Sequence, residues 1–157
     1  MLRTRVGYCG GTKEKPTYLS MGDHTEAVAI DFDPTVTSYG ELLERFWDGH
    51  YCGSNVSSRP YMYAVFYQNE EQRKVAEEYR AKAAVKQGVA VAAVTTAILP
   101  AGQFTSAATY HQKYYLTRHD VVRDFLRETY PSSKSLADST VATRLNAFLG
   151  SGFDKDP

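Results

Sequence analysis

The chain has 157 residues, the length of one domain with a substantial hydrophobic core. Its 18 basic residues balance its 18 acidic residues, so no net charge favours a nucleic acid or an anionic membrane as partner. Two cysteines are too few for a disulfide scaffold and indicate a reducing compartment, for which we expect the cytoplasm. No apolar run approaches the ~20 residues of a membrane-spanning helix. We therefore expect no nucleic-acid or membrane partner.

The first half of the chain predicts two strands, a helix and a third strand, over residues 2–8, 26–32, 38–49 and 61–67. The first strand alternates apolar and polar residues and stops at Gly10-Gly11. Ser38 and Glu41 form a capping box that begins the helix. The third strand has the highest β-branched and aromatic content of the chain.

The second half predicts a helix, a strand, two more helices, a hinge and a last helix, over residues 69–87, 89–99, 107–116, 119–128, 131–135 and 139–149. Asn69 caps the first of these helices with Gln72, and Gly88 stops it. Strands that alternate with helices predict two or three layers of α/β structure around a mixed sheet. We expect one domain, with a core over residues 1–118 and a helical tail over residues 119–157.

A carboxyl group and several phenols are the candidates for chemistry. Glu26 begins a buried strand and Tyr18 lies in the loop before it, an arrangement suited to donating a proton to an oxygen on a substrate. Tyr61 begins another strand and Tyr114 lies in a predicted helix, so all four could converge on one pocket. The alternative is that the tyrosines belong to the core or its rim and that Glu26 is an exposed carboxylate.

Other kinds of site have less support. His24 and His111 have no partner at the spacing of metal ligands, and no Cys-x-x-Cys occurs, so we expect no metal. No nucleophile-elbow motif supports Ser-His-Asp catalysis, and Gly10-Gly11 lacks the following helix of a dinucleotide site.

The two cysteines leave two interpretations open. Cys52 lies two residues after His50, whose ring could partly ionise the thiol and make it a nucleophile or a resolving thiol. Cys9 lies in a strand-to-loop turn. The alternative is a small buried hydrophobe for Cys9 and an incidental surface thiol for Cys52.

Six motifs occur in order along residues 2–118: VGYCGG, PTY, GDHTE, DP, SYGELLERFW and YHQKYYL. Together they make the chain similar to the methionine sulfoxide reductase A family, the peptide-methionine (S)-S-oxide reductases. Alanine is common in this family at the position of Cys9, which supports a small hydrophobe there. The resemblance implies an α+β fold, an α/β two-layer sandwich in which helices flank a mixed sheet.

The resemblance also implies an activity and its residues. The family reduces methionine (S)-sulfoxide, in proteins or as free methionine, with a thiol, as antioxidant repair under oxidative stress. By position, Glu26 is the acid, Tyr18 and Tyr61 hold the sulfoxide oxygen, and Tyr114 and His24 contact the substrate. No bound cofactor is implied; thioredoxin or another thiol reductant is the expected electron donor, and we expect a monomer.

Three departures from the family pattern bear on turnover. The family's first strand ends in Gly-Cys-Phe-Trp, whose cysteine is the nucleophile, and the resemblance implies that this chain begins after that strand and its helix. We therefore expect both to be missing from the fold, which would expose an unpaired sheet edge. This predicts either a marginally stable fold or one fragment of a longer gene product. Ser57 stands where many members carry Asp, and no cysteine follows Leu116 to resolve a disulfide. The alternative function is an inactive truncated relative that keeps the sulfoxide pocket.

Overall fold

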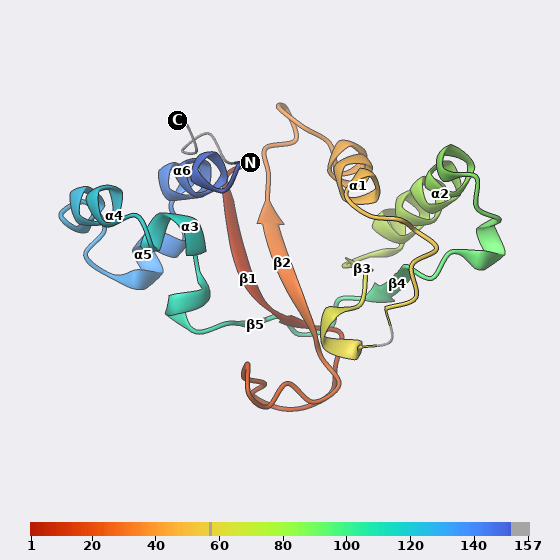
Figure 1. The fold of residues 1–157 in the computed structure, drawn as a ribbon, viewed down its shortest axis with the longest axis horizontal. Coiled ribbons are helices and arrows are strands. Elements are labelled where there is room, and N and C mark those ends of the chain that lie inside the picture. The colour runs from red at the N-terminus through yellow and green to blue at the C-terminus, as the bar shows by residue number, and fades with distance from the viewer. Residues whose placement is uncertain (57, 152–157) are drawn as a thin grey trace. The chain divides into compact units, whose positions relative to one another are not determined.

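A computed structural model describes residues 1–56 and 58–151 and confirms the α+β class (Figure 1). The strands are β1 (Arg3–Cys9), β2 (Thr25–Asp31), β3 (Ala64–Tyr67), β4 (Ala97–Pro100) and β5 (Thr105–Ser106). The α-helices are α1 (Tyr39–Asp48), α2 (Glu70–Gln87), α3 (Tyr114–Thr117), α4 (Asp120–Arg127), α5 (Ser133–Ala137) and α6 (Thr140–Gly150). Single 3₁₀ turns cover Arg59–Tyr61, Val91–Ala93 and Thr109–His111. In the described part of the chain, no helix is long and apolar enough to cross a membrane.

The chain forms two compact units, and it passes from one to the other within β1 and within β2. Unit 1 consists of Met1–Gly7, Ala27–Asp33 and Ser106–Pro157, and unit 2 of Tyr8–Glu26 and Pro34–Thr105. The expected division into a core over residues 1–118 and a tail over residues 119–157 stays a prediction.

The strands form two small sheets. The order in the first sheet is β2-β1-β5. Leu2 N–H donates to the Asp31 carbonyl at 2.8 Å, so the start of β1 lies beside the end of β2, as in an antiparallel pair. In the second sheet, β3 and β4 are parallel, from Ala64 opposite Ala97 to Tyr67 opposite Pro100. A parallel pair needs a crossover connection, and α2 provides it.

The caps expected for the two longest helices of unit 2 are confirmed. The Glu41 N–H donates to Ser38 Oγ at 3.1 Å, and the Glu41 carboxylate accepts from the Ser38 N–H at 2.7 Å. The Asn69 side chain accepts from the Gln72 N–H at 2.9 Å. Gly88 ends α2 in the left-handed region, with φ +69°, which only glycine adopts without strain.

The core of unit 2 lies between α1, α2 and β3. Its buried members are Leu43, Trp47, Cys52, Val65, Ala76 and Ala83. Ala76 and Ala83 are seven residues apart and therefore share one face of α2, where their small side chains leave room for the large ring of Trp47. Burial of these groups fixes α1 and β3, between which the loop of residues 49–63 is anchored.

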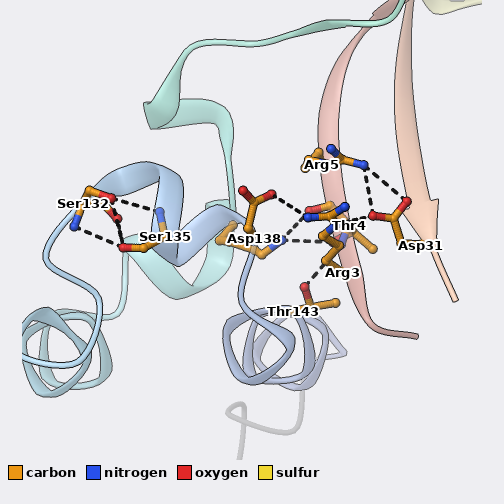
Figure 2. A network of polar contacts seen from close by, with 9 residues as sticks. Arg3, Thr4, Arg5, Asp31, Ser132, Ser135, Asp138 and Thr143 are labelled. Atoms are coloured by element: carbon orange, nitrogen blue, oxygen red, sulfur yellow. Dashed lines mark hydrogen bonds and ion pairs between the residues drawn. The ribbon is translucent and has the colours of Figure 1, made fainter. Parts of the chain in front are cut away.

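In unit 1, polar side chains hold β1 to the segments around it (Figure 2). Arg3 and Arg5 on β1 pair with Asp31 on β2, and Arg3 also lies 3.7 Å from Asp138, next to α5. The Thr4 N–H donates to the Thr143 hydroxyl of α6 at 3.3 Å. The start of β1 is thus fixed to helices that the tail contributes.

The helix predicted over residues 107–116 is wrong. Gln112 is extended and Lys113 is in the left-handed region, with φ +51°, so only a 3₁₀ turn and the short α3 form. The Gln112 amide donates to the Val6 carbonyl at 2.8 Å and accepts from the Val6 N–H at 3.0 Å. The buried Lys113 ammonium donates to the Thr4 carbonyl, and burial lowers its pKa. These tertiary bonds replace the helix.

Three other boundaries differ from the prediction. Pro60 lies in the 3₁₀ turn Arg59–Tyr61, which takes up Tyr61, so the strand expected over residues 61–67 shortens to β3. The strand expected over residues 89–99 splits into a 3₁₀ turn and β4. The hinge expected over residues 131–135 is instead the start of α5, with a capping box of Ser132 and Ser135. The tail helices are confirmed as α4 and α6.

Candidate active site

The loop that joins β1 to β2 begins with two glycines that pack without room for a side chain. Gly10 has φ +74°, and a Cβ there would overlap the ring of Phe66. A Cβ on Gly11 would lie 2.6 Å from both Cγ and the backbone N of His24 and 2.7 Å from Asp23 Oδ1. The two glycines therefore let the start of this loop lie directly against its end.

His24 holds the loop from inside. The Gly11 N–H donates to His24 Nδ1 at 3.2 Å, and His24 Nε2 lies 2.9 Å from the Lys13 carbonyl. Because an N–H can only donate and a carbonyl can only accept, the ring is the neutral tautomer with its proton on Nε2. His24 is 3% exposed and both ring nitrogens are used. These bonds give His24 a structural role in the loop, and its expected contact with substrate stays a prediction.

Asp23 fixes the next turn of the same loop. Its carboxylate accepts from the Lys13 N–H at 3.1 Å, from the Thr12 N–H at 2.8 Å and from the Thr12 hydroxyl at 2.9 Å. These donors, led by the Lys13 N–H, lower the pKa of Asp23 to about 2. The loop that carries Tyr18 is thus tied at both ends by side chains of its last residues.

Arg59 connects this loop to the segment that carries Tyr61. Its Nε donates to the Asp23 carbonyl and its terminal NH₂ to the Gly10 carbonyl, both at 2.8 Å. The Arg59 carbonyl in turn accepts from the buried Thr25 hydroxyl at 3.0 Å. One arginine therefore contacts both ends of the β1–β2 loop and the residue before Glu26.

Tyr18, Glu26 and Tyr61 come together in unit 2. Tyr61 forms a side-chain hydrogen bond with Tyr18, and this bond is the main reason that the pKa of Tyr61 lies above its ordinary value of 10.0. The charges of the Tyr18 and Glu26 side chains raise it further. Tyr61 is 55% exposed and Tyr18 is 47% exposed, so both side chains lie at the surface of the unit. The arrangement offers proton donors to a strong acceptor.

The other expected tyrosine belongs to unit 1. Tyr114 begins α3, where the Arg118 guanidinium lies 4.2 Å from its ring centre and Tyr115 packs edge-on against it. Its role in the pocket stays a prediction. Ser57, expected at the position of a family Asp, lies outside the described residues.

Cys9 is a buried hydrophobe, as the second interpretation held. Its side chain is 3% exposed and its thiol donates to the Ala101 carbonyl at 2.8 Å. Burial raises the pKa of this thiol, although the Gly10 N–H lowers it slightly. A raised pKa reduces the thiolate fraction, which is the opposite of what a nucleophile needs.

Cys52 is a core residue, so the interpretation as a surface thiol is wrong. It is 0% exposed and packs in the unit 2 core. His50 does not activate it, because His50 Nδ1 lies 2.9 Å from the Phe46 carbonyl and Nε2 lies 2.8 Å from the Thr96 hydroxyl. The His50 ring also stacks between Trp47 and Tyr63. Both ring nitrogens are thus used away from the thiol.

Within residues 1–56 and 58–151, no three His, Cys, Asp or Glu side chains are grouped to hold a metal ion. Sequence reasoning missed Arg59 and Asp23, whose bonds build the pocket. Asp23 had a signal, since an Asp after glycine in a polar loop often binds backbone N–H groups. Arg59 had none, because its partners are 36 and 49 residues away.

The fold and this site define an α+β protein in which a carboxyl group interacts with one of two exposed phenols that are bonded to each other. The model of the family "Peptide methionine sulfoxide reductase" matches residues 1–142. A peptide methionine sulfoxide reductase of Drosophila melanogaster is 43% identical over 150 residues, covering 95% of this chain and 59% of that protein. The A5 reductase of Oryza sativa is 33% identical and covers 94% of this chain and 59% of its own length.

A solved structure agrees with the fold. The crystal structure of Mxr1 from Saccharomyces cerevisiae in an unusual oxidized form matches with a TM-score of 0.55 at 21% identity, over 76% of this chain and 68% of that chain. The chain belongs to the peptide methionine sulfoxide reductase family. It spans 59% of the length of the Drosophila and rice relatives.

Proposed function

We propose that this chain carries the sulfoxide-binding and proton-donating part of a peptide-methionine (S)-S-oxide reductase, an antioxidant repair enzyme. The hydrogen bond between Tyr61 and Tyr18, beside the charge of Glu26, is the observation that carries the proposal. Two phenols and a carboxyl group at one open site match the needs of a sulfoxide, whose oxygen is a strong acceptor and a poor leaving group. Family membership supports the same substrate.

The proposed reaction uses these groups as follows. A thiolate attacks the sulfoxide sulfur while Glu26 delivers a proton to the sulfoxide oxygen, which Tyr18 and Tyr61 hold by hydrogen bonds. The S–O bond of the substrate breaks and the oxygen passes to the attacking sulfur. Methionine leaves, reduced by two electrons, and the thiol is oxidised to a sulfenic acid. A second thiol then displaces water to form a disulfide, which thioredoxin or another dithiol reduces. We propose no bound cofactor, a monomer and a cytoplasmic setting.

The attacking thiol is the open part of the mechanism. Cys9 and Cys52 are both buried; the Cys9 thiol donates to the Ala101 carbonyl, and both ring nitrogens of His50 bond away from Cys52. The sequence of residues 1–157 contains no Gly-Cys-Phe-Trp. In this proposal the thiol is therefore supplied from outside the two cysteines of the chain. The burial of both thiols also favours a second candidate function, a relative that binds methionine sulfoxide without turnover.

Binding of N-acetyl-methionine-(S)-sulfoxide methyl amide, followed by NMR of ¹³C-labelled tyrosine, tests the pocket without any thiol. We expect Tyr18→Phe and Tyr61→Phe each to weaken binding by about two- to tenfold, the value of one neutral hydrogen bond. Tyr115→Phe is the matched control, because Tyr115 is as exposed but lies on α3. Failure of the unmodified chain to bind, or equal losses in all three variants, would overturn the proposal.

A turnover assay distinguishes the two candidate functions. The chain is incubated with the (S)-sulfoxide and dithiothreitol or thioredoxin, and methionine is measured. We expect none from residues 1–157 alone. Turnover that is lost in Cys52→Ala would establish Cys52 as the nucleophile and contradict the structural role of its buried thiol.

A further inference from the structure

Arg59 contacts each of the segments that carry Tyr18, Glu26 and Tyr61. Tyr18 belongs to the β1–β2 loop, and the Arg59 guanidinium donates hydrogen bonds to two carbonyls of that loop, those of Gly10 and Asp23. Glu26 follows Thr25, whose hydroxyl donates to the Arg59 carbonyl. Tyr61 ends the 3₁₀ turn that Arg59 begins.

The contacts require an arginine. The guanidinium is planar and presents donors on two sides, so its Nε and one terminal NH₂ reach the two carbonyls, each at 2.8 Å. The other terminal NH₂ lies 3.2 Å from the sulfur of Met62, the residue after Tyr61, and this contact also holds the guanidinium in its orientation. A lysine ammonium at this position reaches one carbonyl and leaves the other without its donor.

Burial supports a fixed arrangement. Thr25 is buried, so its bond to the Arg59 carbonyl is shielded from water. Pro60 restricts the backbone between Arg59 and Tyr61, so a shift of the arginine is transmitted to the phenol two residues later. The Tyr18 and Tyr61 side chains themselves are exposed.

We propose that Arg59 is a positioning residue, which holds the hydroxyl of Tyr61 against Tyr18 and beside Glu26 by joining both ends of the β1–β2 loop to the Tyr61 turn. The positioning of Tyr61 by Arg59 does not depend on the proposed function. Only its effect on sulfoxide affinity rests on that function. Arg59 touches no substrate atom in this proposal. It acts through Tyr61.

The test is the titration of Tyr61, followed by NMR of ¹³Cζ-labelled tyrosine in the full chain and assigned with Tyr61→Phe. In the unmodified chain we expect the pKa of Tyr61 to lie above its ordinary value, because of the side-chain bond to Tyr18. In Arg59→Ala we expect its pKa to fall toward the ordinary value, because the bond to Tyr18 is lost. Loss of a positive charge alone would raise a phenol's pKa, so the two effects have opposite signs. An unchanged or raised pKa of Tyr61 in Arg59→Ala overturns the proposal.

Further variants separate positioning from folding. Arg59→Lys keeps the charge and should give an intermediate pKa, and Thr25→Val, which removes only the hydroxyl bond to Arg59, should shift the pKa in the same direction by less. Arg73→Ala is the matched control, since Arg73 pairs with Glu77 and Glu70 on the surface of α2, and it should leave Tyr61 unchanged. If Arg59→Ala does not fold, Arg59→Lys and Thr25→Val decide: Tyr61 titrating in both as in the unmodified chain overturns the proposal.

The same variants are then tested for binding of N-acetyl-methionine-(S)-sulfoxide methyl amide. We expect Arg59→Ala to bind about tenfold more weakly while Trp47 fluorescence, which reports the unit 2 core, is unchanged. If the unmodified chain binds no sulfoxide, the proposed function fails, and the Tyr61 titration still decides whether Arg59 positions the phenol. Normal sulfoxide affinity in Arg59→Ala counts against the role in binding.

Discussion

Substitution of Gly11 by alanine tests how tightly the β1–β2 loop is closed on itself. The added Cβ would lie 2.6 Å from two atoms of His24, one of them its backbone nitrogen, and 2.7 Å from the Asp23 carboxylate. Backbone cannot move aside as a flexible side chain can. The loop must open, and the bond from the Gly11 N–H to His24 Nδ1 must stretch or break.

The expected cost follows from these contacts. Forcing an extra methyl into a packed site costs about 1–3 kcal/mol, and the lost hydrogen bond adds about 0.5–1.5 kcal/mol. We therefore expect Gly11→Ala to lower the free energy of unfolding by about 2–4 kcal/mol. For a chain of this length, this corresponds to a Tm lower by roughly 5–15 °C.

Urea unfolding followed by Trp47 fluorescence measures the change. Trp47 is the only tryptophan, and it is buried in the core of the unit that contains the loop. Gly49→Ala is the matched control, because Gly49 has φ −80° and its added Cβ would come no closer than 3.4 Å to any atom, so its stability should be unchanged or raised by up to about 1 kcal/mol. Equal urea midpoints for Gly11→Ala and the unmodified chain would refute the close packing of Gly11 against His24 and Asp23.

Two further predictions concern acid stability and the buried thiol. The pKa of Asp23 is lowered from 3.8 to about 2, so its contribution to stability is complete above 3.8 and is lost as the pH falls through 2. Asp23→Asn should therefore be less stable than the unmodified chain near neutral pH, and the difference in urea midpoint should disappear at a pH low enough to protonate Asp23 in the folded chain. A difference in midpoint that does not vary with pH would contradict this. At Cys52, serine should destabilise by about 1–3 kcal/mol because its hydroxyl is buried in an apolar core, and alanine should cost less, about 0.5–1.5 kcal/mol. A thiol reagent that labels Cys52 as fast in the native chain as in urea would show that the side chain is not buried.

Residue type and spacing were sufficient to predict a structural element where the contacts that determine it join residues close together in the chain. The Ser38 and Glu41 capping box, the Asn69 cap and the Gly88 stop each satisfy backbone groups within one helical turn, so their positions could be predicted from residue type and spacing. The prediction of a helix over residues 107–116 failed for the opposite reason. Gln112 and Lys113 bond to residues more than 100 positions earlier, and those bonds outweigh helix propensity.

The cysteines and His24 show the same division within the site. Spacing put Cys52 near His50, but only the folded chain shows that both nitrogens of His50 bond to Phe46 and Thr96. Likewise, the position of His24 in the sequence suggested a contact with substrate, but in the folded chain both of its ring nitrogens form hydrogen bonds with backbone groups of the loop. Hydrogen-bond satisfaction depends on every neighbour in space, which spacing does not reveal.

The sequence by itself determined the family, the α+β class, the capped helices and three pocket candidates, Tyr18, Glu26 and Tyr61, because motifs and caps are encoded by residues near each other along the chain. Only the tertiary structure decided that Tyr61 bonds to Tyr18, that both thiols are buried and that Arg59 joins the loop to the Tyr61 turn. These features arise from contacts between distant segments, whose geometry is set by the packing of the whole unit.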